Sequence, residues 1–174
     1  QRFRALAPVL RECFVGFSSS LIMDIYDGRL LIFMGTPHTQ QEAERLSAAV
    51  METVAAPLPD VVLCRCSGLQ NTADVRAAYL DFRENLQDAM RIYPTRRSYT
   101  WGDIRFSGSC RLAVQGGEAA LDACLDVIAP VQKDREELDL TETLSVYLLD
   151  GERSVTLTSQ LLHLHKNTVK YRLH

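Results

Sequence analysis

The sequence predicts an α+β fold, in which an antiparallel-containing sheet is covered by helices, followed by an all-helical C-terminal domain. Two apolar, β-prone segments, 21–26 and 29–34, are separated only by Asp27 and Gly28. Asp-Gly between two strands is the strongest short signal for a hairpin, because a type I′ turn needs positive φ at both central residues. Segments with apolar residues at helical spacing flank the hairpin and dominate after Gly102. This order is typical of a sheet packed against helices and then a helical region.

Four further elements are expected in the first part of the chain. In chain order they are a helix in 2–14, a helix in 40–55, a buried strand in 61–66 and a helix from Asn71 or Thr72 to about Ile92. Asn and Thr are typical N-caps, so either of these two residues can start the last helix. We expect that helix to bury one stripe of side chains, formed by Val75, Tyr79, Phe82, Leu86 and Met90.

The remaining part of the chain is expected to hold a short strand at 99–101 and then helices. The helical patterns cover about 117–128, 138–149 and two short segments within 154–174. Small and flexible residues at 107–109 and at 116–117 are typical of a linker. We therefore place the domain boundary between residues 108 and 109, which gives an α+β domain at 1–108 and a helical domain at 109–174.

Composition narrows the class of protein. The formal net charge is −3, with 47% apolar and 24% charged residues, values typical of a soluble globular protein that is not a non-specific polyanion binder. No apolar run approaches the roughly 20 residues that span a bilayer, so we expect a cytoplasmic protein without a membrane partner. The cysteines are odd in number and lack metal-type spacing, so we expect reduced, buried thiols. They are Cys13, Cys64, Cys66, Cys110 and Cys124.

The last 21 residues, 154–174, have the pattern of two short helices joined by a turn. Ser159 is a small residue suited to a close crossing of two helices. Leu162 on the first helix, Leu164 in the turn, and Val169 and Leu173 on the second helix supply an apolar inner face. The segment carries three fixed positive charges and no acid, whereas 131–153 carries 3 − 7 = −4. A cationic surface on an acidic chain is typical of a site for phosphate. An ordinary amphipathic helix pair with a solvated basic face is the alternative.

The sequence His-Lys-Asn-Thr-Val-Lys-Tyr-Arg-Leu at 165–173 resembles the C-terminal helix-turn-helix of bacterial regulators of the PucR/CdaR type. Further upstream, 68–90 and 24–33 resemble parts of the GGDEF-like domain that precedes this motif in the family. Ser159 stands where the family usually has Ala. The family's motif normally continues beyond the position of His174, and a first strand and a sensory region usually precede the position of Gln1. The resemblance therefore implies a chain that is incomplete at both ends.

The resemblance implies a sequence-specific transcriptional regulator that inserts its last helix into the major groove of double-stranded DNA. His165, Lys166 and Asn167 are expected to begin that helix and to lie deepest in the groove. Asn can pair with adenine, and Lys166 or Lys170 with guanine or with phosphate. The expected DNA-binding residues are His165, Lys166, Asn167, Thr168, Lys170, Tyr171 and Arg172. Tyr171 and Arg172 are expected to contact the DNA backbone, and Thr168 to contact a phosphate or to pack.

No catalytic, metal or cofactor site is expected, and the protein is not expected to be an enzyme. At 26–30, where a diguanylate cyclase has Gly-Gly-acid-acid-Phe, the chain reads Tyr-Asp-Gly-Arg-Leu. Arg29 stands where an acid would bind Mg²⁺, so the carboxylates that metal and triphosphate need are missing. We expect the GGDEF-like domain to serve assembly or signal transmission in a homodimer or higher homo-oligomer. Any small-molecule effector is expected to bind outside this chain. The alternative is a ligand-sensing or oligomerisation module that does not bind DNA by itself.

Overall fold

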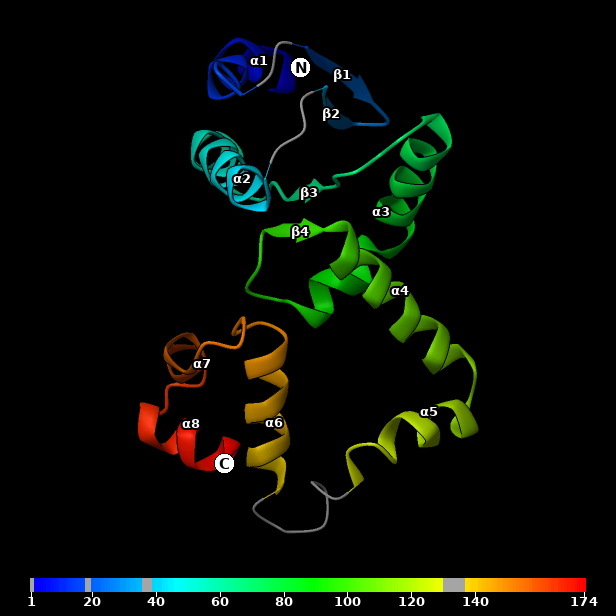
Figure 1. The fold of residues 1–174 in the computed structure, drawn as a ribbon, viewed down its shortest axis with the longest axis vertical. Coiled ribbons are helices and arrows are strands. Elements are labelled where there is room, and N and C mark those ends of the chain that lie inside the picture. Colours follow the sequence, from blue (N-terminus) through cyan, green and yellow to red (C-terminus); the bar gives the residue numbers. More distant parts are fainter. Residues whose placement is uncertain (1, 18–19, 36–38, 130–136) are drawn as a thin grey trace. The chain divides into compact units, whose positions relative to one another are not determined.

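The computed structural model describes residues 2–17, 20–35, 39–129 and 137–174 (Figure 1). The chain divides into two compact units, Gln1–Gln70 and Asn71–His174. Within the described residues there are eight helices and four strands of three to six residues. Helix and strand are therefore mixed, as expected, with helices dominating the second unit. None of the helices in this part of the chain is long and apolar enough to cross a membrane.

The first unit is built around an antiparallel hairpin. Its elements are α1 (Arg2–Cys13), β1 (Leu21–Tyr26), β2 (Arg29–Met34), α2 (Gln40–Ala55) and β3 (Leu63–Arg65). The ladder of β1 and β2 runs from Leu21 opposite Met34 to Tyr26 opposite Arg29. Asp27 has φ 48° and Gly28 has φ 71°, which are the two positive values that the predicted turn requires. The hairpin prediction is confirmed. The strand expected at 61–66 is shorter, at Leu63–Arg65.

The core of the first unit lies between α1, α2 and one face of the hairpin. Leu10 of α1 and Phe14, which directly follows α1, are buried against Leu46, Val50 and Val54 of α2. Alternate residues of the hairpin pack partly on this cluster, as the two-residue period of a strand requires; they are Leu21, Met23, Leu30, Ile32 and Met34. Thr39 caps α2 in a capping box with Glu42, so that helix begins where its sequence signal places it.

The second unit contains the remaining elements. They are α3 (Thr72–Ile92), β4 (Ser98–Thr100), α4 (Trp101–Gln115), α5 (Glu118–Leu125), α6 (Glu137–Leu148), α7 (Val155–Leu161) and α8 (Lys166–Leu173). Asn71 is the N-cap of α3, and its side-chain oxygen accepts from the backbone N–H groups of Ala73 and Asp74. Thr100 and Asp103 form a capping box at the start of α4. Both caps satisfy backbone donors that a helix start leaves free.

Packing of α3 on α4 corrects two predictions. The most buried residues of α3 are Ala78, Asn85 and Ala89, whereas Met90 of the predicted stripe is 37% exposed. On α4, Ser107 and Gly108 are buried, and a Cβ added to Gly108 would lie 3.0 Å from the Asn85 side chain. The small residues at 107–109 are therefore not a linker, because they allow two helices to approach closely. The predicted boundary at 108/109 falls inside α4, and the compact units divide at 70/71 instead.

Candidate nucleic-acid interface

The three helices α6, α7 and α8 pack on one another through a tight connection after α6 (Figure 1). The N–H of Gly151 donates to the carbonyl of Val146 at 2.6 Å, and the N–H of Arg153 donates to that of Tyr147 at 2.8 Å. These bonds satisfy carbonyls at the C-terminal end of α6. Gly151 is buried and leaves no room for a side chain, because an added Cβ would meet Thr158 Oγ1 of α7. The helical pattern expected at about 138–149 thus corresponds to α6, which ends at Leu148.

Helices α7 and α8 meet through small and apolar side chains. Ser159 is 6% exposed, and Thr158 and Val169 are fully buried. The N–H of Leu164 in the turn donates to the carbonyl of Ser159 at 2.9 Å, which ties the turn to α7. Burial thus agrees with the expected positions of Ser159 and Val169. Leu162 is the C-cap of α7 rather than one of its helical residues.

The turn between the two helices contains a left-handed residue. His163 has φ 54°, a conformation that glycine adopts freely and that other L-residues adopt at a cost of about 1–2 kcal/mol. Its N–H donates to the carbonyl of Gln160 at 3.3 Å. Histidine adopts this conformation more often than most non-glycine residues do, but one histidine in a sequence does not predict it.

We expect His163→Val to lower the free energy of unfolding by about 1–2 kcal/mol, because a β-branched side chain is strained at positive φ. In His163→Gly the relief of left-handed strain is offset by greater entropy of the unfolded chain, so a change within about 0.5 kcal/mol is expected. Urea unfolding followed by far-ultraviolet circular dichroism measures both. Equal losses in the two variants would show that His163 contributes through its side chain and not through its backbone.

The start of α8 presents three exposed polar residues. His165 is the N-cap, and its Nδ1 accepts from the N–H of Asn167 at 3.2 Å. This bond satisfies a backbone N–H in the first turn of α8, so the imidazole of His165 stabilises the start of the helix. His165, Lys166 and Asn167 are all exposed, at the end of the helix where the partial positive charge of backbone N–H groups adds to that of lysine.

The other four predicted DNA-binding residues divide between two faces of α8. Lys170 and Tyr171 are exposed, with Tyr171 83% exposed. Thr168 is half-buried, which suits packing. Arg172 lies on the inner side, where its guanidinium donates to the Oγ1 of fully buried Thr143 on α6 at 3.1 Å. Arg172 follows Val169 by three residues, so both lie on one helix face. The three-residue spacing from Val169 is the sequence signal that places Arg172 on the inner face of α8, away from Lys170 and Tyr171.

The structure brings no metal-binding cluster together elsewhere in the residues that it describes. None of the five cysteines forms a disulfide. Cys124 is exposed and the other four are half-buried, so the expectation of buried thiols is wrong for Cys124. Burial raises the pKa of the Cys64 thiol to about 11, which keeps that sulfur protonated at neutral pH.

Comparison with known proteins identifies the last three helices. Residues 140–174 match the family model of the PucR C-terminal helix-turn-helix domain, from within α6 to the end of α8. No curated protein and no solved structure matches the chain. The match agrees with the packing of α6, α7 and α8 and with the exposed polar start of α8. Residues 140–174 of this chain are thus a helix-turn-helix domain of the PucR C-terminal type.

Proposed function

We propose that the protein is a sequence-specific, DNA-binding transcriptional regulator of the PucR/CdaR type, and that α8 is its recognition helix. One observation carries this proposal: the start of α8 exposes His165, Lys166 and Asn167 on a helix whose opposite side is anchored by fully buried Val169. A rigid helix with polar groups at its N-terminal end suits insertion into the major groove, which is wide enough to admit an α-helix.

The exposed residues of α8 are assigned different tasks by their chemistry. The side-chain amide of Asn167 can donate to N7 of adenine and accept from its N6 amino group, which distinguishes adenine from the other bases. Lys166 and Lys170 supply charge for guanine or phosphate, and Tyr171 supplies a hydroxyl for the DNA backbone. Because the guanidinium of Arg172 is bound to Thr143, we assign it to holding α8 on α6 and not to a DNA contact.

We expect Asn167→Ala to relax base preference by about 1–3 kcal/mol at one position of the operator, because the bidentate pair with adenine is lost while the charges remain. Selection from a random duplex library, run in parallel on both proteins, measures the preference at every position. Gln87→Ala removes an exposed amide from α3 and is the matched control, with no change expected. An unchanged selected site in Asn167→Ala would remove this residue from base readout.

The region expected at 1–108, which resembles a GGDEF-like domain at 24–33 and 68–90, is proposed to serve assembly or signal transmission without catalytic activity. Its hairpin turn supports the absence of cyclase chemistry. Arg29 donates to the Asp27 carboxylate at 2.6 Å, so the acid of the turn is paired with a cation where a cyclase would need free carboxylates for Mg²⁺. Incubation with GTP and Mg²⁺ should therefore yield no cyclic dinucleotide, and the appearance of that product would contradict this assignment.

We propose that the protein acts as a homodimer or higher homo-oligomer. A single α8 offers little contact area, and regulators with this motif commonly read two half-sites about 34 Å apart. Analytical ultracentrifugation on operator DNA tests this directly. Two copies of the chain on one operator would support it, and one copy at saturation would contradict it.

A further inference from the structure

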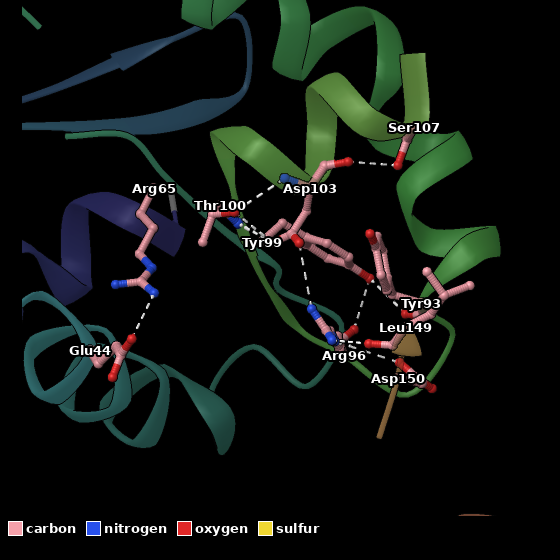
Figure 2. A network of polar contacts seen from close by, with 10 residues as sticks. All are labelled: Glu44, Arg65, Tyr93, Arg96, Tyr99, Thr100, Asp103, Ser107, Leu149 and Asp150. Carbon is pink, nitrogen blue, oxygen red and sulfur yellow. Dashed lines mark hydrogen bonds and ion pairs between the residues drawn. The ribbon is translucent and has the colours of Figure 1, made fainter. Parts of the chain in front are cut away.

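A cluster of polar side chains joins the α3–α4 part of the second unit to the end of α6 (Figure 2). We call it the Arg96 cluster; its members are the side chains of Thr95, Arg96, Asp103 and Asp150 and the backbone carbonyl of Leu149. Thr95 and Arg96 lie in the connection between α3 and β4, Asp103 lies in the first turn of α4, and Leu149 and Asp150 directly follow α6. Residues far away in the sequence, Thr95 and Arg96, therefore bind the C-terminal end of α6, the helix that precedes α7 and α8.

Arg96 is the centre of the cluster. Its guanidinium lies 4.5 Å from the centroid of the Tyr93 ring, and its Nη1 lies 3.6 Å from Asp103 Oδ1. On the other side its Nε lies 3.7 Å from Asp150 Oδ1, and its Nη2 donates to the carbonyl of Leu149. A cation that binds the last carbonyls of a helix is favoured by the helix dipole. One planar side chain thus links the N-terminal end of α4 to the C-terminal end of α6.

Asp150 completes the connection from the side of α6. It is 8% exposed, and its Oδ2 accepts from Thr95 Oγ1 at 2.6 Å and from the Thr95 N–H at 3.3 Å. A carboxylate buried to this degree needs both an opposite charge and hydrogen bonds. Thr95 supplies two hydrogen bonds to Oδ2, whereas Oδ1 has the ion pair with Arg96 Nε and no hydrogen bond among the described residues. Since these bonds are directional, they specify an orientation of α6 that apolar packing alone would define less sharply.

The part of the cluster on the α3 side is itself held rigidly. The Tyr99 hydroxyl donates to the carbonyl of Arg96 at 2.9 Å and to that of Tyr93 at 3.2 Å, and Tyr99 is 1% exposed. Asp103 is fixed by its capping box with Thr100. Burial and the nearby carboxylate of Asp103 raise the pKa of Tyr93, with Arg96 acting in the opposite direction. The backbone of Arg96 is therefore held by Tyr99, and the guanidinium reaches from there to the end of α6.

We propose that Arg96 and Asp150 are positioning residues that set the orientation of α6, α7 and α8 relative to α3 and α4. Where α8 reads DNA, which rests on the proposed function, this joint fixes the direction in which the recognition helix is presented. A change in the orientation of α6 at this joint would also move α8, which binds Thr143 of α6 through Arg172, and α7, whose Thr158 packs on Gly151.

The test is the relative orientation of the two helix groups in solution, measured by residual dipolar couplings of backbone N–H groups. In the wild type, one alignment tensor should fit α3–α4 and α6–α8 together. In Arg96→Gln and Asp150→Asn the two groups should need different tensors, while amide shifts show that α6–α8 remains folded. Arg91→Gln removes an exposed arginine that pairs with Asp88 at 3.3 Å and is the matched control, with one tensor retained.

Thr95→Val keeps the shape of the side chain and removes one hydroxyl bond, so it tests the joint even where Arg96→Gln fails to fold. In Thr95→Val the alignment tensors of α3–α4 and of α6–α8 should differ from each other, but by less than they do in Asp150→Asn. One common tensor in Asp150→Asn and Thr95→Val would overturn the proposal. So would different tensors in the wild type, because the joint would then not hold the two groups.

A DNA measurement extends the test to function. We compare Asp150→Asn with the wild type on a promoter duplex with two half-sites and on a duplex with one. Affinity for two half-sites should fall by at least about fivefold, within the range typical of coupling between distinct sites, whereas affinity for one half-site stays unchanged. Equal losses on both duplexes would contradict positioning. If the wild type does not select promoter DNA, the proposed function fails, while the tensors still decide whether the joint exists.

Discussion

The double variant Lys166→Ala/Lys170→Ala is expected to lose most of its DNA affinity at physiological salt. Both lysines are exposed on α8 and are its fixed charges on the outer face, since Arg172 is turned toward Thr143. A hydrogen bond to a charged group contributes about 1.5–3 kcal/mol, so each lysine that contacts DNA is expected to change affinity by at least roughly tenfold.

The salt dependence of binding identifies how the two lysines act. Each phosphate contact contributes about 0.9 to the slope of log affinity against log salt, because neutralising a phosphate releases a counterion. The slope of the double variant should therefore be lower by about 2 for each bound copy, provided that both lysines contact phosphate. Filter binding at several salt concentrations measures affinity and slope together.

The matched control removes two positive charges from elsewhere in the chain. Arg76→Ala/Arg83→Ala changes net charge equally on exposed positions of α3. If α8 makes the contacts, this control retains nearly full affinity and slope. Similar losses in both double variants would show that overall charge, and not the recognition helix, governs binding.

Gly151→Ala is expected to give the largest loss of stability from a single added carbon. The new Cβ would meet Thr158 Oγ1 and would lie 2.8 Å from the carbonyl oxygen of Val146. Because the second contact is with backbone, the chain between α6 and α7 must shift, and overpacking of this kind costs about 1–3 kcal/mol. Urea unfolding followed by the fluorescence of Trp101, the single tryptophan, reports on the second unit.

Gly102→Ala is the matched control for this change. An added Cβ at Gly102 would meet only Thr100 Oγ1 at 3.5 Å, which is ordinary contact. Alanine favours a helix more than glycine does, so the variant should be between unchanged and about 1 kcal/mol more stable. If Gly151→Ala were as stable as Gly102→Ala, the close packing of α6 on α7 would be wrong.

Local signals in the sequence predicted the elements whose causes are local. The Asp-Gly turn, the polar N-cap of α3 and the apolar spacing of α2 each depend on a few neighbouring residues, and the structure has all three where they were expected. The exposed start of α8 was predicted for the same reason, because Val169 and Leu173 define the inner face of that helix by their spacing.

Features that depend on distant contacts could not be read in this way. Ser107 and Gly108 are as typical of a linker as of a helix crossing, and only the approach of Asn85 on α3 decides between them. Asp150, a partner of Arg96, lies 150 − 96 = 54 residues away in the sequence. Thr143, a partner of Arg172, lies 172 − 143 = 29 residues away. A charged residue in a loop or last turn gives no sequence signal of so distant a partner.

The central claim is that α8 reads DNA, and fluorescence anisotropy of the protein on its own promoter and on a scrambled duplex of equal length tests it most directly. The protein should bind the promoter more tightly than the scrambled duplex at physiological salt, and it should lose that binding in Lys166→Ala/Lys170→Ala. Equal and weak binding to both duplexes, unchanged in the double variant, would contradict the claim. The chain would then be a ligand-sensing or oligomerisation module in which the helix-turn-helix has a structural role.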